Sequence, residues 1–321
     1  MIIVPEAKIA DLMTRDAAFA AVEQVFAAMS ARDARNFPVI REALGHEDAL
    51  YGFKGGFDMA GHSLGLKAGG YWPHNMERRN LINHQSTVFL FDPDTGRVRA
   101  MVGGNLLTAL RTAAASAVSI RHLARPDARV LGMVGAGHQA GFQMRAALEQ
   151  RAFDRVIAWN RSPARLRGLE RIAEEAGVAF EAVALERMEE ADVIVTITSA
   201  FEPSLMAHHV SPGTHLACMG TDTKGKQEVD AALMKFAEVY ADEIAQSVTI
   251  GEAQHAVAAG SLTAGDITEI GSVINGTATG RSSQEAITLF DGTGVGLQDL
   301  AVAAAVVDLA VAKGDAIEIE I

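Results

Sequence analysis

The sequence predicts an α/β protein in which a doubly wound Rossmann domain accompanies an α+β domain. The chain has 321 residues, a length that suggests about two domains. From residue 129 onwards, apolar strand-like segments alternate with helical patterns, which is typical of a parallel sheet covered by helices. Before that point, strand-like segments follow one another with turn residues between them, which indicates an antiparallel sheet. We place the α+β domain at residues 1–125 together with 296–321, and the Rossmann domain at 126–295.

The first domain is expected to begin with a helix over residues 5–33, because its apolar residues recur at helical spacing. Four strand-like segments follow, and a long alanine-rich helix over about 105–124 leads out through Arg125-Pro126-Asp127. The apolar positions of the first helix are Ile9, Leu12, Phe19, Val22, Phe26 and Met29, and the strand segments read VIREAL, ALYGFKG, SLGLKAGG and TVFLFD.

The second domain is expected to open with the strand RVLGMV and a helix over 138–150. The strand RVIAWN at 155–160 precedes a helix that starts at Ser162-Pro163 and ends before Gly177, because Ser at the N-cap and Pro at the first helical position are start signals. An Ala/Val-rich helix over about 297–313 is expected to pack into the first domain or into a subunit interface. The remaining strands read VAFEAV, DVIVTITS, THLACMG and EVYAD.

Composition narrows the class of protein. A formal net charge of −12 argues against nucleic-acid binding, which needs a basic surface. No apolar run approaches the roughly 18 residues of a membrane span, and the N-terminus lacks a basic leader, so we expect a cytoplasmic protein that does not bind membranes. Cys218 is the single cysteine; its apolar neighbours favour a small core residue over a reactive thiol. No metal site is expected.

A glycine-rich turn joins the first strand of the Rossmann domain to its helix. Residues 135–140 read Gly-Ala-Gly-His-Gln-Ala, the G-x-G-x-x-A form of the dinucleotide fingerprint. In this motif Gly135 permits the tight turn, Gly137 lets the backbone approach a pyrophosphate, and the small Ala140 allows close packing of helix on strand. His138 and Gln139 complete the predicted cofactor loop, and the alternative is an ordinary tight turn.

The end of the second Rossmann strand bears on which cofactor is bound. NAD-binding proteins usually carry Asp or Glu there for the ribose 2′-hydroxyl, whereas this chain has Asn160, Arg161 and Ser162. Arg161 can bind a 2′-phosphate, so these residues alone favour NADP or mixed use. The alternative is a solvated arginine in the loop that starts the helix.

A cationic segment lies within this acidic chain. Residues 61–125 hold eight Lys or Arg and three acids, a local balance of 8 − 3 = +5, which suggests a small anionic substrate. Lys67 and Arg111 lie among small and apolar residues, and Arg41 follows Phe37-Pro38-Val39-Ile40. Three cations in apolar surroundings suit a carboxylate clamp, because arginine binds carboxylate bidentately. Buried structural ion pairs are the competing interpretation.

Five segments together resemble the ornithine cyclodeaminase/mu-crystallin family over essentially the whole chain: GLKAGGYWPHN, NLLTALRTAAASAVS, GMVGAGHQA, MGTDTKGKQEVD and FDGTGVGLQD. The resemblance implies a homodimer, a substrate and dimerisation domain completed by the C-terminal helix, and a Rossmann domain that binds NAD(P). It implies that Arg41, Lys67 and Arg111 hold the substrate carboxylate and that Asp222 handles its amine. The implied cofactor contacts beyond the glycine loop are Thr198, Ser199, Met219, Gly220, Asp291, Thr293 and Gly294.

Two positions depart from this family pattern. Members usually have Ser-Thr-Gly after the aspartate that corresponds to Asp291, whereas this chain has Gly292-Thr293-Gly294 and lacks the serine. Lys54 is an additional cation to which the resemblance gives no role.

The chemistry that the family shares is hydride transfer between a nicotinamide and the Cα of an amino acid or its imine, with Lys67 and Asp222 as the expected catalytic residues. A diamino acid needs a distal anion in the site, and a dicarboxylate needs a distal cation. The segment WPHNMERRNLINHQ offers cations and donors, of which His84 and Arg78 are the candidates for a substrate contact, and this favours a dicarboxylate.

Four phrases of the chain, including EDALYGFKGGFD and NLINHQSTVFLFDPDTGRV, are most similar to family members that reduce iminosuccinate to L-aspartate with NADH during glyoxylate or glycolate assimilation. That similarity places NADH first and leaves NADPH as an alternative. Ornithine cyclodeamination, alanine dehydrogenation and a non-catalytic binding role like that of mu-crystallin are the other functions that remain open.

Overall fold

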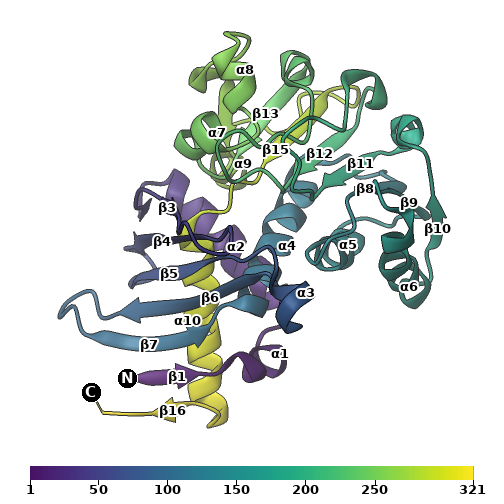
Figure 1. Ribbon diagram of the computed structural model, residues 1–321. Coiled ribbons are helices and arrows are strands. Elements are labelled where there is room, and N and C mark those ends of the chain that lie inside the picture. The colour runs from purple at the N-terminus through teal and green to yellow at the C-terminus, as the bar shows by residue number, and fades with distance from the viewer. Residues whose placement is uncertain (321) are drawn as a thin grey trace. The chain divides into compact units, whose positions relative to one another are not determined.

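A computed structural model describes residues 1–320 and has the α/β class expected from the sequence (Figure 1). The chain forms two compact units, Met1–Arg111 with Val295–Ile321, and Thr112–Gly294. The boundary between the units falls inside the helix α4 (Asn105–Leu123). Within residues 1–320, no helix is both long and apolar enough to cross a membrane.

The first unit contains one large sheet with helices against it. Its remaining elements are β1 (Ile2–Val4), α1 (Ile9–Leu12), α2 (Arg15–Ser30), β2 (Ala34–Asn36), β3 (Ile40–Ala43), β4 (Leu50–Asp58), β5 (Ser63–Tyr71), α3 (Asn75–Arg79), β6 (His84–Phe91), β7 (Val98–Gly103), α10 (Gly296–Lys313) and β16 (Ile317–Glu318). The strand order is β16-β1-β7-β6-β5-β4-β2, and β3 pairs with β4.

The expected antiparallel sheet is present from β2 to β7, but β1 runs parallel to β7. The expectation of one helix over 5–33 was wrong, because this range divides into a 3₁₀ turn over Glu6–Lys8, the short helix α1 and the longer helix α2, with a break before Arg15. The Thr14 hydroxyl accepts a hydrogen bond from the Ala17 amide and caps α2. The Thr14 cap thus starts a new helix, while the apolar residues on either side keep their helical spacing. The spacing alone therefore did not reveal the break.

The C-terminal helix α10 packs against β4 and β5 of the first unit, as Figure 1 shows. Glycines on these strands allow the close approach: a Cβ added to Gly56 would lie 2.9 Å from Leu297, and one added to Gly65 would lie 2.9 Å from Leu300. The helix therefore brings its first turns onto the face of the sheet that carries Lys67, which opposes Val88 and Lys54 on the neighbouring strands.

The second unit is a parallel sheet in the order β10-β9-β8-β11-β12-β15-β13-β14. The order reverses between β8 and β11, the switch point at which doubly wound sheets bind nucleotides. Its elements are β8 (Val130–Val134), α5 (Ala140–Leu148), β9 (Arg155–Trp159), α6 (Arg167–Ala176), β10 (Ala179–Ala182), β11 (Val193–Thr196), β12 (His215–Cys218), β13 (Ala237–Ala241), α7 (Ile244–Ile250), α8 (Gln254–Ala258), β14 (Ile267–Glu269), α9 (Ile270–Ile274) and β15 (Ile287–Asp291).

Two details of this unit bear on the sequence predictions. The helix expected from Ser162-Pro163 begins as a 3₁₀ turn over Pro163–Leu166 and continues as α6, which ends at Gly177 in a left-handed conformation with φ of 68°. Cys218 is fully buried in the core of the unit, and burial raises the pKa of its thiol well above the ordinary value. The prediction of a small core residue is thus confirmed.

Candidate functional site

The glycine loop between β8 and α5 has the geometry that a dinucleotide requires. Gly135 has a φ of 111°, and a Cβ there would lie 2.5 Å from the Ile197 carbonyl oxygen, so only glycine fits without strain. Gly137 is exposed, and a Cβ added to it would meet no atom within 4 Å. The open space over Gly137 is where a phosphate can approach the backbone at the start of α5.

The other residues expected to contact the cofactor follow the carboxyl ends of adjacent parallel strands. Strands β9, β8, β11, β12 and β15 are neighbours in that order, so their carboxyl ends lie along one edge of the sheet. The structure therefore gathers at one edge the segments that sequence reasoning took from separate parts of the chain, namely Asn160–Ser162, Thr198–Ser199, Met219–Gly220 and Asp291–Gly294.

Asn160 and Arg161 at the end of β9 have different surroundings. The Asn160 side chain accepts a hydrogen bond from the Ala136 amide at 3.2 Å and donates to the Ser162 carbonyl at 2.8 Å, so it ties the glycine loop to the next strand end. Arg161 is exposed. This arrangement assigns Asn160 a part in shaping the loop and leaves Arg161 accessible to a ligand.

Glu228 is a residue of this edge that sequence reasoning missed. Its buried carboxylate accepts hydrogen bonds from the amides of Thr198 (2.5 Å) and Gly220 (2.7 Å) and from the Thr196 hydroxyl (2.7 Å). It therefore joins the loops that follow β11 and β12. The signal available in the sequence was the acid of the segment MGTDTKGKQEVD, which follows the predicted cofactor loops, since the backbone amides of buried loops need acceptors.

A second buried acid supports the first. Glu252 accepts from the Thr221 hydroxyl and from the amides of Glu228 and Val229, both at 2.8 Å. Burial, together with the charge of the neighbouring Glu228, raises the pKa of the Glu252 carboxyl to about 8. Burial also raises the pKa of Glu228. The two carboxyls thus share a dry environment in which the charged form of each is disfavoured.

Asp222 lies close to this pair and has a cationic neighbour. Its Oδ1 accepts from Lys226 Nζ at 2.9 Å and from the Thr223 hydroxyl at 3.2 Å, and its side chain is 31% exposed. An accessible carboxylate held by a lysine suits proton exchange with a substrate nitrogen.

The loop from Asp291 to Gly294 is held by buried carboxylates. Asp242 accepts from the Thr293 amide and hydroxyl and from the Gly294 amide at 2.8 Å. Asp291 accepts from the Ser247 hydroxyl at 2.6 Å and the Ala253 amide at 3.2 Å, and burial raises the pKa of its carboxyl to about 7. The loop is therefore rigid at the positions where a nicotinamide contact is expected.

In the first unit, the two buried cations singled out from the sequence meet at one carboxylate. Asp299 of α10 accepts from Lys67 Nζ at 2.8 Å and from Arg111 Nε at 3.0 Å. Arg111 Nη1 also donates to Gln298 Oε1 at 2.9 Å, and Lys67 Nζ donates to the Thr108 hydroxyl at 3.3 Å. The competing interpretation, a buried ion pair, is therefore realised in this structure.

This ion-paired group still carries a net positive charge, because two cations face one acid. Burial lowers the pKa of Lys67 to about 8, although Asp299 acts in the opposite direction. Burial raises the pKa of Asp299, but the charges of Arg111 and Lys67 outweigh it and lower that pKa overall. A small anion placed here would relieve the repulsion between the cations.

Three further residues were expected near the substrate. Arg41 opposes Gly52 in the β3–β4 pairing, two residues from Lys54 and so on the same face of the sheet as Lys67, and its charge contributes to the lowered pKa of Lys67. His84 Nε2 lies 3.2 Å from Ser86 Oγ. Arg78 is 52% exposed and forms an ion pair with Glu47 at 2.7 Å.

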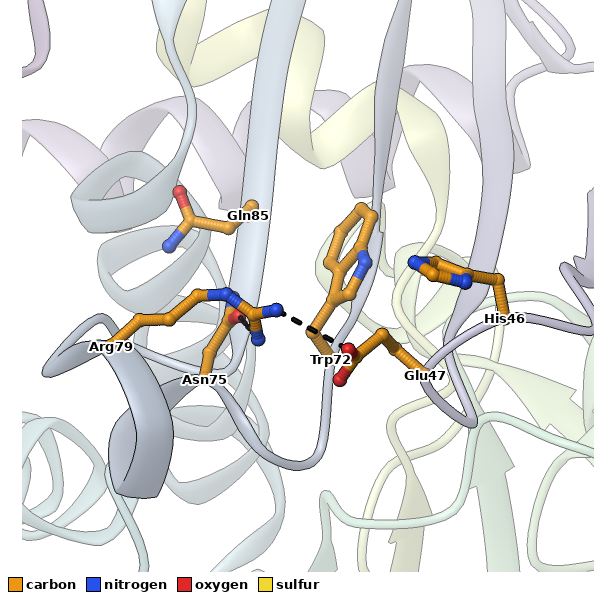
Figure 2. A pocket seen from close by; sticks show the side chains of 6 residues that line it. All are labelled: His46, Glu47, Trp72, Asn75, Arg79 and Gln85. Carbon is orange, nitrogen blue, oxygen red and sulfur yellow. Dashed lines mark hydrogen bonds and ion pairs between the residues drawn. The ribbon is translucent and has the colours of Figure 1, made fainter.

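Figure 2 shows a pocket of about 250 Å³ in this unit, beside α3. Within it, Arg79 points toward Glu47, with Nη2 to Oε1 at 3.3 Å, and toward Asn75, with Nη1 to Oδ1 at 3.4 Å. Glu47 has a left-handed backbone with φ of 55°. The remaining lining residues are His46, Trp72 and Gln85. Glu47 thus partly neutralises both arginines of the segment that was expected to supply a distal cation.

Within residues 1–320, no group of three or more His, Cys, Asp or Glu side chains is arranged to hold a metal ion.

Comparison with known proteins places the chain in a family. Residues 6–314 match the model of the ornithine cyclodeaminase/mu-crystallin family. The chain belongs to this family. It is 64% identical over 322 residues to the iminosuccinate reductase of Paracoccus denitrificans, with 100% of each chain covered. It is 32% identical to the alanine dehydrogenase of Archaeoglobus fulgidus, over 97% of this chain and 96% of that protein.

Solved structures agree with this placement. The crystal structure of the Paracoccus denitrificans iminosuccinate reductase in complex with NAD⁺ matches with a TM-score of 0.96 at 64% identity, over 100% of this chain and 99% of that one. A dimeric archaeal alanine dehydrogenase with bound NAD matches with a TM-score of 0.94 at 30% identity, over 100% and 99% of the two chains.

Proposed function

We propose that this protein reduces iminosuccinate, an α-imino dicarboxylate, to L-aspartate with NADH. The observation that carries the proposal is the buried cluster of Lys67, Arg111 and Asp299 in a chain 64% identical over its full length to an iminosuccinate reductase. In this proposal the enzyme is an NAD(P)-dependent imine reductase that forms an L-amino acid. We propose that it acts in the cytoplasm.

Arg41, Lys67 and Arg111 hold the α-carboxylate of the substrate in this proposal. The planar fork of Arg111 can form two parallel hydrogen bonds to a carboxylate, while Lys67 supplies a point charge. With a pKa of about 8, the Lys67 ammonium is still mostly charged at neutral pH. Asp299 and Gln298 fix the direction of the Arg111 side chain through its Nε and Nη1.

NADH fits the open loop at Gly137 and the row of strand ends beside it, and when bound it supplies the hydride that reduces the imine carbon. Glu228 orders the loops after β11 and β12, and Asp242 orders Thr293 and Gly294. Asp222 exchanges the proton at the substrate nitrogen, and Lys226 keeps its carboxylate oriented. As an anion, Asp222 also stabilises a protonated imine.

NADH is proposed ahead of NADPH because two of the most similar solved structures hold NAD. Arg161, exposed at the end of β9, supports NADPH as the alternative, since an arginine there can pair with a 2′-phosphate. The oligomer proposed is a homodimer, and a relative of the same fold is described as a dimer.

The test follows NADH absorbance with three substrates in parallel. Oxaloacetate with ammonia forms iminosuccinate in solution, pyruvate with ammonia forms the monocarboxylate imine, and L-ornithine tests cyclodeamination. We expect fast NADH oxidation with the first mixture, formation of L-aspartate, and much slower reaction with pyruvate. Fast oxidation with pyruvate and ammonia would instead make the protein an alanine dehydrogenase, the second candidate, which the 32% identical relative supports.

Conversion of L-ornithine to proline without net NADH change would overturn the proposal. Repeating the first arm with NADPH gives the cofactor preference directly. Ligand binding without NADH oxidation in any arm would indicate a binding protein.

A further inference from the structure

Lys54 is a buried lysine that the proposed carboxylate clamp does not use. It is 7% exposed and lies in the middle of β4. Burying an ammonium group is costly, so lysines rarely lie this deep unless a negatively charged group interacts with them. A functional role for its charge is therefore worth testing.

Its place in the sheet sets Lys54 beside the clamp. Lys54 and Lys67 are directly opposite each other in the antiparallel pairing of β4 with β5, so their side chains project from the same face. The charge of Lys54 contributes to the lowered pKa of Asp299. The start of α10 is tight against β4 at this point, since a Cβ on Gly296 would lie 2.5 Å from the Gly55 nitrogen. Lys54 thus belongs to the same layer as Lys67 and Asp299.

The buried charges of this unit are unbalanced. Among its described residues, four charged side chains are less than 10% exposed, namely Lys54, Lys67, Arg111 and Asp299. Their formal sum is 3 − 1 = +2. A monocarboxylate would neutralise half of this excess, whereas a dicarboxylate would neutralise all of it.

We propose that Lys54 binds the second carboxylate of the substrate, and that the opposed pair of Lys54 and Lys67 selects a four-carbon dicarboxylate. The inference rests on the proposed function and names the residue that determines its specificity. Directly opposite residues in such a pair have Cβ atoms about 4.5–5.5 Å apart. The two carboxylates of a four-carbon diacid are separated by two carbon atoms, so each can face one ammonium of the pair.

The cations near α3 are less suited to this task. Arg78 and Arg79 are 52% and 43% exposed, and both pair with Glu47. An exposed and already paired guanidinium gains little from a further carboxylate, because water screens it. The hydrogen bonds His84–Ser86, Ser86–Thr108 and Thr108–Lys67, at 3.2, 3.5 and 3.3 Å, connect His84 to Lys67 through two other side chains. Lys54 instead opposes Lys67 directly.

The experiment compares Lys54→Met with the matched control Lys8→Met. Lys8 lies in the same unit, is 44% exposed and pairs with Asp315, so the control removes a lysine charge far from the buried layer of the sheet. For each protein, kcat/KM is measured with oxaloacetate plus ammonia and with pyruvate plus ammonia, and the ratio of the two values is the readout. We expect Lys54→Met to lower this ratio at least 100-fold, about 2.7 kcal/mol, mainly through a higher KM for the dicarboxylate. Lys8→Met should leave the ratio unchanged.

A binding measurement separates the role in substrate recognition from catalysis. Succinate, titrated calorimetrically into the protein with NADH, should bind at least 10-fold more weakly to Lys54→Met, whereas propionate binding should be little changed. Lys54→Arg should restore part of the succinate affinity, because it restores the charge. If Lys54→Met does not fold, Lys54→Gln, which keeps a polar end, takes its place.

Equal losses with both imines, or an unchanged ratio, would overturn the assignment of Lys54. A fall in the ratio for Arg78→Met instead would move the second carboxylate to the α3 segment. Failure of the wild-type protein to reduce iminosuccinate at all would refute the proposed function, which is a different outcome from a failure of Lys54 to discriminate.

Discussion

Asp299 is the acid on which the buried cations of the first unit depend. It is fully buried, and its Oδ1 accepts from both Lys67 and Arg111. Its Oδ2 has no hydrogen-bond partner among the described residues, so the carboxylate is only half satisfied. Buried charges of this kind stabilise little by themselves, because desolvation offsets most of the attraction. Their retention in a dry layer is better explained by an anionic ligand than by stability.

Replacing Arg111 by alanine should lower kcat/KM for iminosuccinate at least 100-fold, about 2.7 kcal/mol, because the substrate loses a bidentate partner. Steady-state kinetics, with a thermal melt of the same sample, provide the measurement. Arg111→Lys is the matched control: it keeps the charge beside Asp299 but loses the fork, and should be impaired less. A loss below fivefold in a folded Arg111→Ala protein would remove this residue from the clamp.

The sequence was sufficient to find Lys67 and Arg111 because a charge among apolar residues stands out locally. It did not reveal Asp299, which lies 232 residues from Lys67 and 188 from Arg111 along the chain. An acid near the start of a helix looks like an ordinary N-terminal acid, since carboxylates are favoured there by the helix dipole. Only the packing of α10 on β4 and β5 turns it into the partner of both cations.

At the scale of elements, the Rossmann unit was the more predictable one. Its strands are continuous apolar runs bounded by turn residues, and β8 through β12 fall within the segments expected from the pattern. Short elements such as β1, β14 and β16 were missed, because two or three residues carry no periodicity. The longer strands β7 and β15, of 6 and 5 residues, were missed as well. Local sequence pattern does not encode the strand order, so the neighbours of each strand became known only from the structure.

The two glycines of the cofactor loop should respond differently to substitution. Gly137→Ala places its methyl group in open space, so we expect an unchanged melting temperature and an NADH affinity at least 10-fold weaker, because the methyl occupies the space that a phosphate needs. Gly135→Ala meets the Ile197 carbonyl oxygen at 2.5 Å and has a φ of 111°, so the fold itself should lose about 1–3 kcal/mol of stability.

Fluorescence titration of NADH and thermal unfolding of each variant separate the two effects. Tight NADH binding by Gly137→Ala would mean that the pyrophosphate does not pass over this loop.

At the scale of the whole molecule, the first unit presents an apolar surface that a second copy of the chain would cover. Several large apolar side chains on or near β3 and β4 are exposed, at 41% for Phe37 and Phe53 and 53% for Ile40. Phe53 alternates with Lys54 along β4 and so points away from the buried charges, with its ring 5.6 Å from that of Tyr51.

Light scattering should therefore give a mass of twice the 33.9 kDa chain, and Phe53→Lys should shift the protein toward the monomer, because it places a charge in an apolar interface. Lys8→Met, outside this surface, serves as the control for a surface substitution. A wild-type mass equal to that of one chain would contradict the homodimer.

The buried acids of the second unit make the stability of the molecule depend on pH in a defined direction. Burial raises the pKa of Glu252 from 4.5 to about 8 and that of Asp291 from 3.8 to about 7. At a pH between the unfolded and the folded pKa of each group, the unfolded chain has released a proton that the folded chain still holds. The contribution of these groups to the free energy of unfolding is therefore complete below the unfolded pKa. It falls as the pH rises and levels off above the folded pKa.

Glu252→Gln isolates one of these contributions, since an amide resembles the protonated acid and can still accept from the amides of Glu228 and Val229. Urea unfolding of wild type and variant from about pH 5 to about pH 8.5 should show the wild type losing stability relative to the variant, by at most about 1.4 kcal/mol per pH unit for one proton. Parallel curves would mean that Glu252 ionises normally in the folded protein. The negative charge that Glu252 gains as the pH rises repels Glu228, whose carboxylate holds the loops after β11 and β12, so the same rise in pH should also weaken NADH binding in the wild type more than in the variant.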